Sequence, residues 1–459
     1  MPRWPSRSIG PSTLFCATAC ATPPSGWPLP TVSSGRRARP RPEGIEMGKL
    51  VGIDFGTTNS CMAVLDQGKP KVILDKERYK IIPSVVYFYK KNEETRIMVG
   101  RAAKSKFVEN PFCTIHSIKR FLGKSFDMDE VKSAQERYFY IIDKDEKADS
   151  HQPNILIRVH EFDLSAPPVE IATYIFKYLK QVAENYLKEP VEDVVITMPT
   201  TFQTRYSAAI KQVAEGAGLN IVGLLNETTA TAYAFGYINR GDHTIAVYDL
   251  GGGTFDFSIL RRIPGGYEEI ATLGESWLGG DDFDHAIVQY LIREFKNATR
   301  NRKFADGKVY KEGITITNKD VLRAVRAEAE KAKIALSETE TTLIHVAKVI
   351  PEIDPTVDLN LKLSRDLLEY VVSDLVEKTI TIALDTMENA NTLVPKLKLD
   401  ALLLVGGQSR MPKIKQRLRE VFGDIIFDQI LPEEAVAIGA AIYGNVLKAV
   451  EKRKAQAQA

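Results

Sequence analysis

The chain has 459 residues, of which 44% are hydrophobic and 26% are charged, and this composition is ordinary for a soluble globular protein. Its length leaves room for two or three domains, and because it holds no run of about eighteen apolar residues we expect no membrane span. The net charge is +2, but residues 1–46 carry six arginines and two glutamates, so the rest of the chain carries −2, which argues against a general nucleic-acid binder.

Residues 1–46 are rich in proline, serine and arginine and show no hydrophobic periodicity, so we expect a disordered or non-native N-terminal extension. An acid-poor stretch over residues 1–42 also fits an organellar transit peptide, although its prolines oppose an amphipathic helix. A third interpretation is an upstream start codon, with the protein beginning at Met47. The sequence leaves these alternatives open, and we expect a cytoplasmic protein.

Strand and helix patterns alternate from Leu50 onward, which indicates an α/β architecture. The predicted strands are Leu50–Phe55, Cys61–Leu65, Val194–Met198, Thr244–Tyr248, Phe257–Leu260 and Ala401–Val405. The predicted helices are Tyr206–Ala217, Glu227–Gly236, Asp282–Phe295, Lys319–Leu336, Arg365–Asn389, Pro412–Phe422 and Glu433–Ala449. The charged stretches 144–150 and 302–311 are expected to be solvated loops.

Two short segments repeat one pattern, IDFGTTNS from residue 53 and YDLGGGTFD from residue 248. Each ends a strand on an acid, turns on glycine, offers threonine hydroxyls and resumes as a strand. Glycine permits close approach of a ligand to the backbone, so the N–H groups and hydroxyls of such a turn cradle phosphate oxygens. Because Asp54 and Asp249 would repel bare phosphate, we expect a divalent cation between them and the ligand. The repeat predicts two lobes that grip one nucleotide.

Two further segments fit a nucleotide site. Gly406 and Gly407 follow a buried-type strand and precede the helix at Pro412, which suits a ligand lying against the backbone. On the helix 320–337, three polar residues lie at i, i+3 and i+7 on one flank of the apolar stripe. These residues are Glu330, Lys333 and Ser337. Taken alone, this flank is the solvated border of an amphipathic helix.

Other conspicuous side chains have plainer interpretations. The four cysteines and six histidines lack the spacing of a metal site or a disulfide framework. Asp282 and Asp284 are expected to cap a helix. Trp277 and Tyr233 are expected to pack in the interior.

Together these segments resemble the nucleotide-binding domain of the heat-shock protein 70 family, the DnaK-like chaperones. The resemblance covers Gly48 to about Lys448 and rests on GIDFGTTNSC, the Lys119-Arg120 segment before Leu122-Gly123, NETTATAYAFGY, YDLGGGTFDFSIL, LGGDDFD, EKAKIALS, LVGGQSR and PEEAVAIGAA. It implies the actin-like ATPase fold, an α/β architecture of two duplicated lobes around a nucleotide cleft. The lobes are expected at residues 47–236 and 237–430, with residues 431–459 forming a C-terminal helix that returns to the first lobe and a polar tail.

The resemblance also implies roles for individual residues. Lys119 would reach the γ-phosphate and the attacking water, with Glu227, Asp249 and Thr254 as the other catalytic groups. Asp54 and Asp249 would organise the water shell of Mg²⁺, and Asp256 would help bind a monovalent cation such as K⁺. The residues implied to hold ATP or ADP are Gly56, Thr57, Thr58, Asn59, Gly251, Gly252 and Gly253 around the phosphates, and Gly280, Glu330, Lys333, Ser337, Gly406, Gly407 and Arg410 around the adenosine.

Departures from the family pattern are equally specific. Relatives continue into a β-sandwich that holds unfolded peptide, whereas this sequence ends in a polar tail, so we do not expect direct peptide binding. The family's interdomain sensor pairs a proline with an arginine eight residues on, but here PTTF (199–202) is followed by Ser207, with Arg205 two positions early. Thr228 replaces a proline, and Ile334 stands where some relatives stack an arginine on adenine.

The leading hypothesis is an Mg²⁺-dependent ATP hydrolase, acting on an acid anhydride, with slow turnover. It would serve protein folding or act as a co-chaperone, with full-length chaperone relatives or nucleotide-exchange factors as partners. We expect a monomer that binds neither nucleic acid nor membrane. Two alternatives share the fold: an actin-like filament protein, and a sugar- or acetate-kinase-type phosphotransferase, which would need a general base in place of Lys119 and Glu227.

Overall fold

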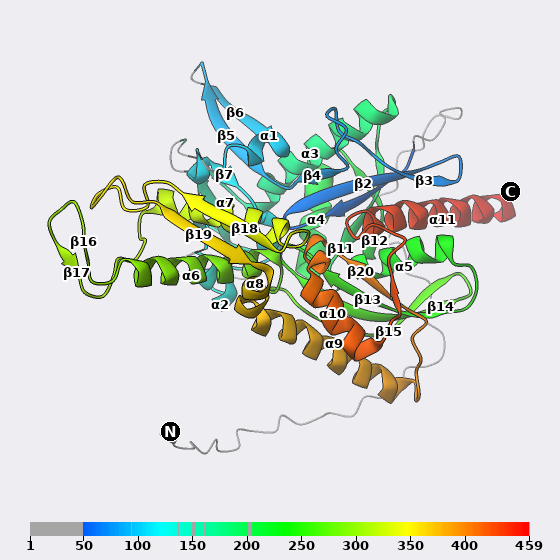
Figure 1. Cartoon of the computed structure of the whole chain (residues 1–459). Coiled ribbons are helices and arrows are strands. Elements are labelled where there is room, and N and C mark those ends of the chain that lie inside the picture. Colours follow the sequence, from blue (N-terminus) through cyan, green and yellow to red (C-terminus); the bar gives the residue numbers. More distant parts are fainter. Residues whose placement is uncertain are drawn as a thin grey trace. The chain divides into compact units, whose positions relative to one another are not determined.

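The apolar segment after Lys49 forms the hairpin of β1 (Val51–Phe55) and β2 (Asn59–Asp66) in the computed structural model (Figure 1). The structure describes residues 49–92, 94–107, 109–135, 137–148, 153–159, 162, 164–200 and 204–458. The predicted extension at residues 1–46 lies outside the described residues, as do Thr201 and Phe202 of the expected sensor segment.

The first large sheet has the strand order β12-β11-β1-β2-β3, with β4 also paired to β2. Its further strands are β3 (Lys69–Val72), β4 (Ile81–Pro83), β11 (Asp193–Met198) and β12 (Asn220–Asn226). The strands β1, β11 and β12 run parallel, whereas β2 and β3 are added antiparallel. The carboxyl end of β1 therefore lies at the same edge as that of β11.

The second large sheet repeats this arrangement, in the order β15-β14-β13-β20-β21. Its strands are β13 (Thr244–Leu250), β14 (Phe255–Ile263), β15 (Gly266–Glu275), β20 (Ala401–Val405) and β21 (Ile426–Phe427). The strands β13, β20 and β21 are parallel, and the hairpin partners β14 and β15 are antiparallel. Each sheet thus has a central strand with a hairpin on one side and parallel strands on the other, as expected for duplicated lobes.

Helices cover both sheets. The longer ones are α3 (Pro168–Leu187), α4 (Thr204–Gly216), α5 (Glu227–Ile238), α6 (Gly280–Ala298), α7 (Lys319–Ala335), α9 (Ser373–Leu393), α10 (Pro412–Phe422) and α11 (Ala435–Gln458). Figure 1 shows α9 beside β15 and α11 beside α5. Helix α9 also contacts β14, and α11 also contacts β1. Because α5 contacts strands of both sheets and also α11, the two helices form a layer that the sheets share.

Smaller elements complete the described fold. The short helices are α1 (Arg101–Lys104), α2 (Asp129–Ala134) and α8 (Arg365–Val371), with 3₁₀ turns η1 (Pro111–Cys113), η2 (Ile118–Phe121) and η4 (Gly407–Arg410). The remaining strands are β5 (Val86–Lys91), β6 (Glu94–Val99), β7 (Thr114–Ile115), β8 (Ile141–Lys144), β9 (Ile155–Val159), β10 (Leu164–Ala166), β16 (Arg302–Lys303), β17 (Val309–Tyr310), β18 (Thr341–Val346) and β19 (Leu359–Ser364). None of the described helices is both long enough and apolar enough to span a bilayer.

Among the described residues, the buried apolar side chains form two large cores, one shared core and one small cluster of Cys61, Ala63, Ala437 and Ala441. The first large core draws on residues 51–219 and the second on residues 246–418. The shared core joins Leu50 and Val195 of the first sheet region with Ile245 and Val405 of the second, and with Ala435 of α11. Burial of apolar surface in this third core ties the two lobes together. The lobe boundary predicted after residue 236 falls within α5 and stays a prediction.

Several predicted elements differ from those in the structure. The helix predicted over Arg365–Asn389 is broken at the fully buried Val372, whose φ of −104° and ψ of 9° separate α8 from α9. The stretch 302–311, predicted as a loop, carries the short ladder of β16 and β17. The last helix begins at Ala435 and ends at Gln458, beyond the predicted Ala449.

Candidate functional site

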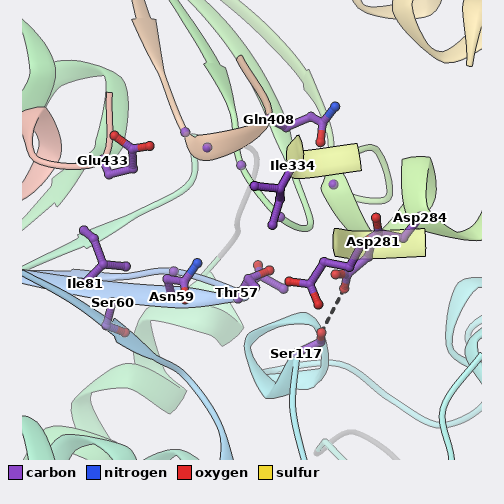
Figure 2. Close-up of a pocket in the computed structure, with 18 of the residues that line it drawn as sticks. Thr57, Asn59, Ser60, Ile81, Ser117, Asp281, Asp284, Ile334, Gln408 and Glu433 are labelled. Carbon is purple, nitrogen blue, oxygen red and sulfur yellow. Dashed lines mark hydrogen bonds between the residues drawn. The ribbon is translucent and has the colours of Figure 1, made fainter. Parts of the chain in front are cut away.

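A cavity of about 520 Å³ brings most of the predicted site residues together (Figure 2). Among these, the residues that line it are Asp54, Gly56, Thr57, Thr58, Asn59, Lys119, Glu227, Asp249, Gly251, Gly252, Thr254, Gly280, Glu330, Lys333, Ser337, Gly406, Gly407 and Arg410. Gly253 and Asp256 do not line it. Segments that are up to about 350 residues apart in the sequence therefore line the same cavity.

The two glycine turns meet at this cavity. The first joins β1 to β2, with Phe55 opposite Ser60, and the second joins β13 to β14, with Leu250 opposite Phe255. They touch each other, because a Cβ placed on Gly252 would lie 1.8 Å from Thr58 Oγ1. Only glycine fits at residue 252. Thr58 Oγ1 is buried and makes no hydrogen bond to a described residue, so it has a free donor and acceptor for a ligand oxygen.

The start of α6 fixes the second turn. The backbone N–H of Gly280 donates to the carbonyl of Gly251 at 2.9 Å, and the N–H of Asp281 donates to the carbonyl of Gly252 at 2.8 Å. Asp282 closes the helix start by accepting the Gly279 N–H at 2.9 Å, so its predicted capping role is confirmed. The first N–H groups of α6 have no partners within the helix. They thus hold the second glycine turn, residues 251–253, in place.

Lys119 and Glu227 form a buried ion pair at the back of the cavity. Lys119 Nζ lies 2.6 Å from Glu227 Oε1, and both side chains are more than nine-tenths buried. Burial works to lower the pKa of Lys119, but the charges of Glu227, Tyr206 and Asp54 outweigh it and raise that pKa above its ordinary value. The lysine therefore keeps its positive charge in an interior position.

The acids at the strand ends have unusual pKa values. Burial and the charge of Glu227 raise the pKa of Asp54 to about 7. Burial and the charges of Glu227, Asp256 and Asp54 raise the pKa of Asp249 well above its ordinary value. Several acids beside a single lysine leave an excess of negative charge that a bound cation would relieve.

This donor set fits Mg²⁺ in one particular way. Carboxylate and hydroxyl oxygens are the ligands that hard divalent cations prefer. Among the described residues no group of three or more His, Cys, Asp or Glu side chains is arranged to hold one ion directly. Asp54 and Asp249 both line the cavity, and their two carboxylates would suit an ion that keeps most of its water shell, as Mg²⁺ characteristically does beside phosphates.

The opposite end of the cavity is built by α6, α7 and the segment after β20. Lys333 Nζ lies 2.9 Å from Asp284 Oδ1 and donates to the Gly280 carbonyl, also at 2.9 Å. Asp284 thus pairs with this lysine rather than capping the helix, and burial raises its pKa to about 6 although Lys333 opposes the shift. Arg410 Nη2 donates to Glu433 Oε2 at 2.6 Å.

Ile334 gives this end an apolar surface. Its side chain is 60% exposed and lines the cavity, and Figure 2 shows it with Gln408 on the other side of the space from Thr57 and Asn59. An exposed isoleucine beside a cavity offers contact to the face of a flat, apolar ring. The predicted loss of an arginine stack on the base is consistent with this surface, and its effect on affinity stays a prediction.

Sequence reasoning missed a hydrogen-bonded chain across the cavity. Ser117 Oγ donates to Asp281 Oδ2 at 2.8 Å, which Figure 2 marks with a dashed line, and His116 Nδ1 lies 3.0 Å from the same Oγ. His116 Nδ1 and Asp281 Oδ2 are thus both within hydrogen-bonding distance of the Ser117 hydroxyl. No local sequence pattern predicts these hydrogen bonds, because Ser117 and Asp281 are 164 positions apart.

Asp256 lies behind the cavity wall. It is opposite Asp249 in the ladder between β13 and β14, and its side chain is 1% exposed. From this position it acts on the cavity through its charge on Asp249. Gly253 instead packs against Thr57 and Arg120, at the rear of the second turn.

Comparison with known protein families agrees with this geometry. Residues 50–456 match the family model described as Hsp70 protein. The match covers nearly all the described residues and includes both glycine turns, Lys119, Glu227 and the strand–glycine segment at residue 406. Two duplicated lobes around one cavity are the arrangement of the actin-like ATPase fold. The chain belongs to the Hsp70 family, and its described part is a nucleotide-binding domain of the chaperone type with this fold.

Proposed function

We propose that the protein binds ATP and ADP together with Mg²⁺ and slowly hydrolyses ATP. The observation that carries the proposal is that both glycine turns, Lys119 and Glu227 line a single cavity of about 520 Å³. Hsp70 proteins are in general ATPases, so family membership supports the same class of reaction. It also favours water as the acceptor over the small-molecule acceptor of a kinase.

Some groups of the site would bind the phosphate oxygens, and others would neutralise the phosphate charge. The hydroxyls of Thr57, Thr58 and Thr254 and the turn N–H groups would bind phosphate oxygens. Lys119 would stabilise the charge that develops at the γ-phosphate and orient the attacking water, since phosphoryl transfer requires positioning and charge neutralisation more than covalent chemistry. Bound Mg²⁺, organised by Asp54 and Asp249, would supply further neutralisation.

The ion pair between Lys119 and Glu227 favours slow turnover. At 2.6 Å and with both partners buried, the pair holds the lysine at Glu227, so movement of its ammonium toward a phosphate oxygen would lengthen this short contact. Breaking a buried ion pair is costly because each charge has been removed from water. Asp256 stays the candidate for a monovalent cation such as K⁺.

Replacement of Lys119 by methionine tests the catalytic proposal. We expect phosphate release to fall by about 10²–10³-fold, the usual effect of removing one preorganised charge, while the affinity for Mg·ATP stays within a few-fold. Phosphate release and equilibrium binding should be measured on the same preparations, with unfolding curves to show that the variant folds despite the buried Glu227.

Lys124→Met is the matched control. Lys124 lies five positions further on, is 19% exposed, pairs with Glu130 at 3.2 Å and does not line the cavity. Its loss should leave phosphate release unchanged. Equal turnover in the Lys119 variant and the unchanged protein would refute the role given to Lys119, and absence of any nucleotide binding would refute the proposed function.

We further propose a role in protein folding, with full-length chaperone relatives or nucleotide-exchange factors as partners. Capture experiments in ADP and in ATP test this, and a partner set that ignores the nucleotide would contradict it. We propose the cytoplasm as the compartment. Mass spectrometry of the native N-terminus tests this, because removal of residues 1–42 would indicate import into an organelle.

A further inference from the structure

Lys119 and Arg120 are neighbours on the short 3₁₀ turn η2, yet they serve different parts of the site. Lys119 pairs with Glu227 at the back of the cavity. Arg120 is directed to the second glycine turn, where its Nη2 lies 3.4 Å from the carbonyl oxygen of Gly252 and donates to it. Two adjacent side chains of η2 therefore reach the Glu227 carboxylate and the second glycine turn.

The guanidinium of Arg120 is held on several sides. Its side chain is 1% exposed, and Nη2 also donates to Asp282 Oδ2 at 3.0 Å. Its Cζ lies 4.6 Å from the centre of the Trp277 ring, within the range of a cation–π contact. A Cβ on Gly253 would lie 2.8 Å from Arg120 Nε, so the planar group lies directly against the turn.

These contacts fix the orientation of the peptide between Gly252 and Gly253. Its carbonyl oxygen accepts from Arg120 on one side and from the N–H of Asp281 on the other. Because a peptide unit is planar, holding the carbonyl also sets the direction of the Gly253 N–H. Because Arg120 holds the turn and Lys119 is its neighbour in the sequence, the position of the turn relative to Lys119 is fixed through these two residues.

We propose that Arg120 is a positioning residue for ATP hydrolysis: it holds the turn 251–253 in register with Lys119. The proposal rests on the ATPase function proposed above. Arg120 does not line the cavity; it acts through the Gly252 carbonyl. Misplacement of reacting groups by about 1 Å can cost about 10²-fold in rate, so loss of Arg120 should lower kcat more than it raises KM.

Arg137 provides a matched control on the same carboxylate. Its Nη1 lies 2.6 Å from Asp282 Oδ1, whereas Arg120 bonds Oδ2, and the Arg137 side chain is 35% exposed. No hydrogen bond joins its guanidinium to the described residues of the turn. Arg137→Gln therefore removes a positive partner of Asp282 and leaves the contact to Gly252 in place.

The test compares Arg120→Gln, Arg120→Lys and Arg137→Gln in the full chain. We expect Arg120→Gln to lower kcat by about 10²-fold with KM within about threefold, and Arg137→Gln to keep kcat within about twofold. Arg120→Lys keeps a charge for Asp282, which protects folding, but its compact ammonium cannot reproduce the planar fork. It should lower kcat by about tenfold, so it decides the question if Arg120→Gln does not fold.

Trp277 gives a second readout at the turn. In a chain with Trp4→Phe and Trp27→Phe it is the only tryptophan left, and it lies against Arg120. Addition of Mg·ADP, which binds without turnover, should change its fluorescence in this background. The change should be lost in Arg120→Lys and kept in Arg137→Gln.

The possible results separate the positioning role of Arg120 from the proposed ATPase function. Unchanged kcat in the Arg120 variants, or equal losses in the Arg120 and Arg137 variants, overturns the positioning role while the ATPase function stands. A rise in KM without a fall in kcat overturns it too, since that pattern marks binding rather than positioning. No turnover in the unchanged protein refutes the proposed function, and the positioning role then falls with it.

Discussion

His116 shows how one residue's surroundings set its charge. The ring centres of Phe107, Tyr138 and Tyr140 lie 5.1, 5.2 and 5.8 Å from that of His116. Burial, assisted by the positive charge of Arg326, lowers the pKa of His116 from 6.5 to about 3. Between these two values the unfolded chain binds a proton that the folded chain does not. The contribution of His116 to stability is therefore complete above pH 6.5 and is lost as the pH falls toward 3.

Replacement of His116 by phenylalanine should remove this pH dependence. Phenylalanine keeps the aromatic contacts but cannot take up a proton. Between pH 7 and pH 5 the unchanged protein should lose about 2 kcal/mol more unfolding free energy than His116→Phe does. Urea unfolding at both pH values measures the difference. His345→Phe, at an exposed position, should behave like the unchanged protein, and parallel pH profiles for all three proteins would contradict the prediction.

At the scale of elements, local signals predict some boundaries and tertiary packing decides others. Pro412 marks the start of α10, and the apolar run Ala401–Val405 coincides with β20. The break at Val372 has no such signal, because its side chain is simply buried between two helical stretches. Helix α3 (Pro168–Leu187) was not predicted, because its many Ile, Tyr, Phe and Val residues also favour strands, although Pro168 stands at its start and its buried residues recur at helical spacing (Ile171, Ile175, Leu179 and Val182).

The site divides in the same way. The glycine turns were predictable because their short-range pattern of acid, glycine and threonine carries its own chemistry. The contacts of Ser117 with Asp281 and of Arg120 with Gly252 were not, since each joins residues more than 130 positions apart. Such pairs form only when both lobes are assembled, so no local segment of the sequence contains them.

The packing of α11 on α5 should depend on Gly439. A Cβ there would lie 1.7 Å from the carbonyl oxygen of Ala230, which is backbone and cannot rotate away. Gly439→Ala should therefore lower the free energy of unfolding by about 3 kcal/mol, the upper end of the usual cost of overpacking. Gly444→Ala in the same helix meets side-chain methyl groups of Leu50 and Val195 rather than backbone, and it should cost less, about 1 kcal/mol, because these side chains can shift and alanine favours the helix. Denaturant unfolding of both variants checks this, and equal costs would contradict it.

In the described unit as a whole, the shared core and the cavity are both built from residues of the two lobes, so both require the lobes to be packed together. The cavity takes walls from the ends of β1, β13 and β20, and thus from both sheets. Helices α5 and α11 contact each other and pack between the sheets. A ligand in the cavity therefore adds contacts to both lobes, and its binding free energy should stabilise the unit as one cooperative structure.

Mg²⁺ should decide how large that stabilisation is. At free Mg·ATP of about a hundred times its Kd, the free energy of unfolding should rise by about 2.7 kcal/mol. With the same ATP and EDTA the rise should be clearly smaller, because Asp54 and Asp249 then face the phosphates without an intervening cation. Asp54→Asn removes one of these charges, so the difference between Mg²⁺ and EDTA should narrow. Urea unfolding followed by circular dichroism measures all four cases, with Mg²⁺ alone as the control. Equal stabilisation by ATP in Mg²⁺ and in EDTA would contradict a metal-bridged triphosphate.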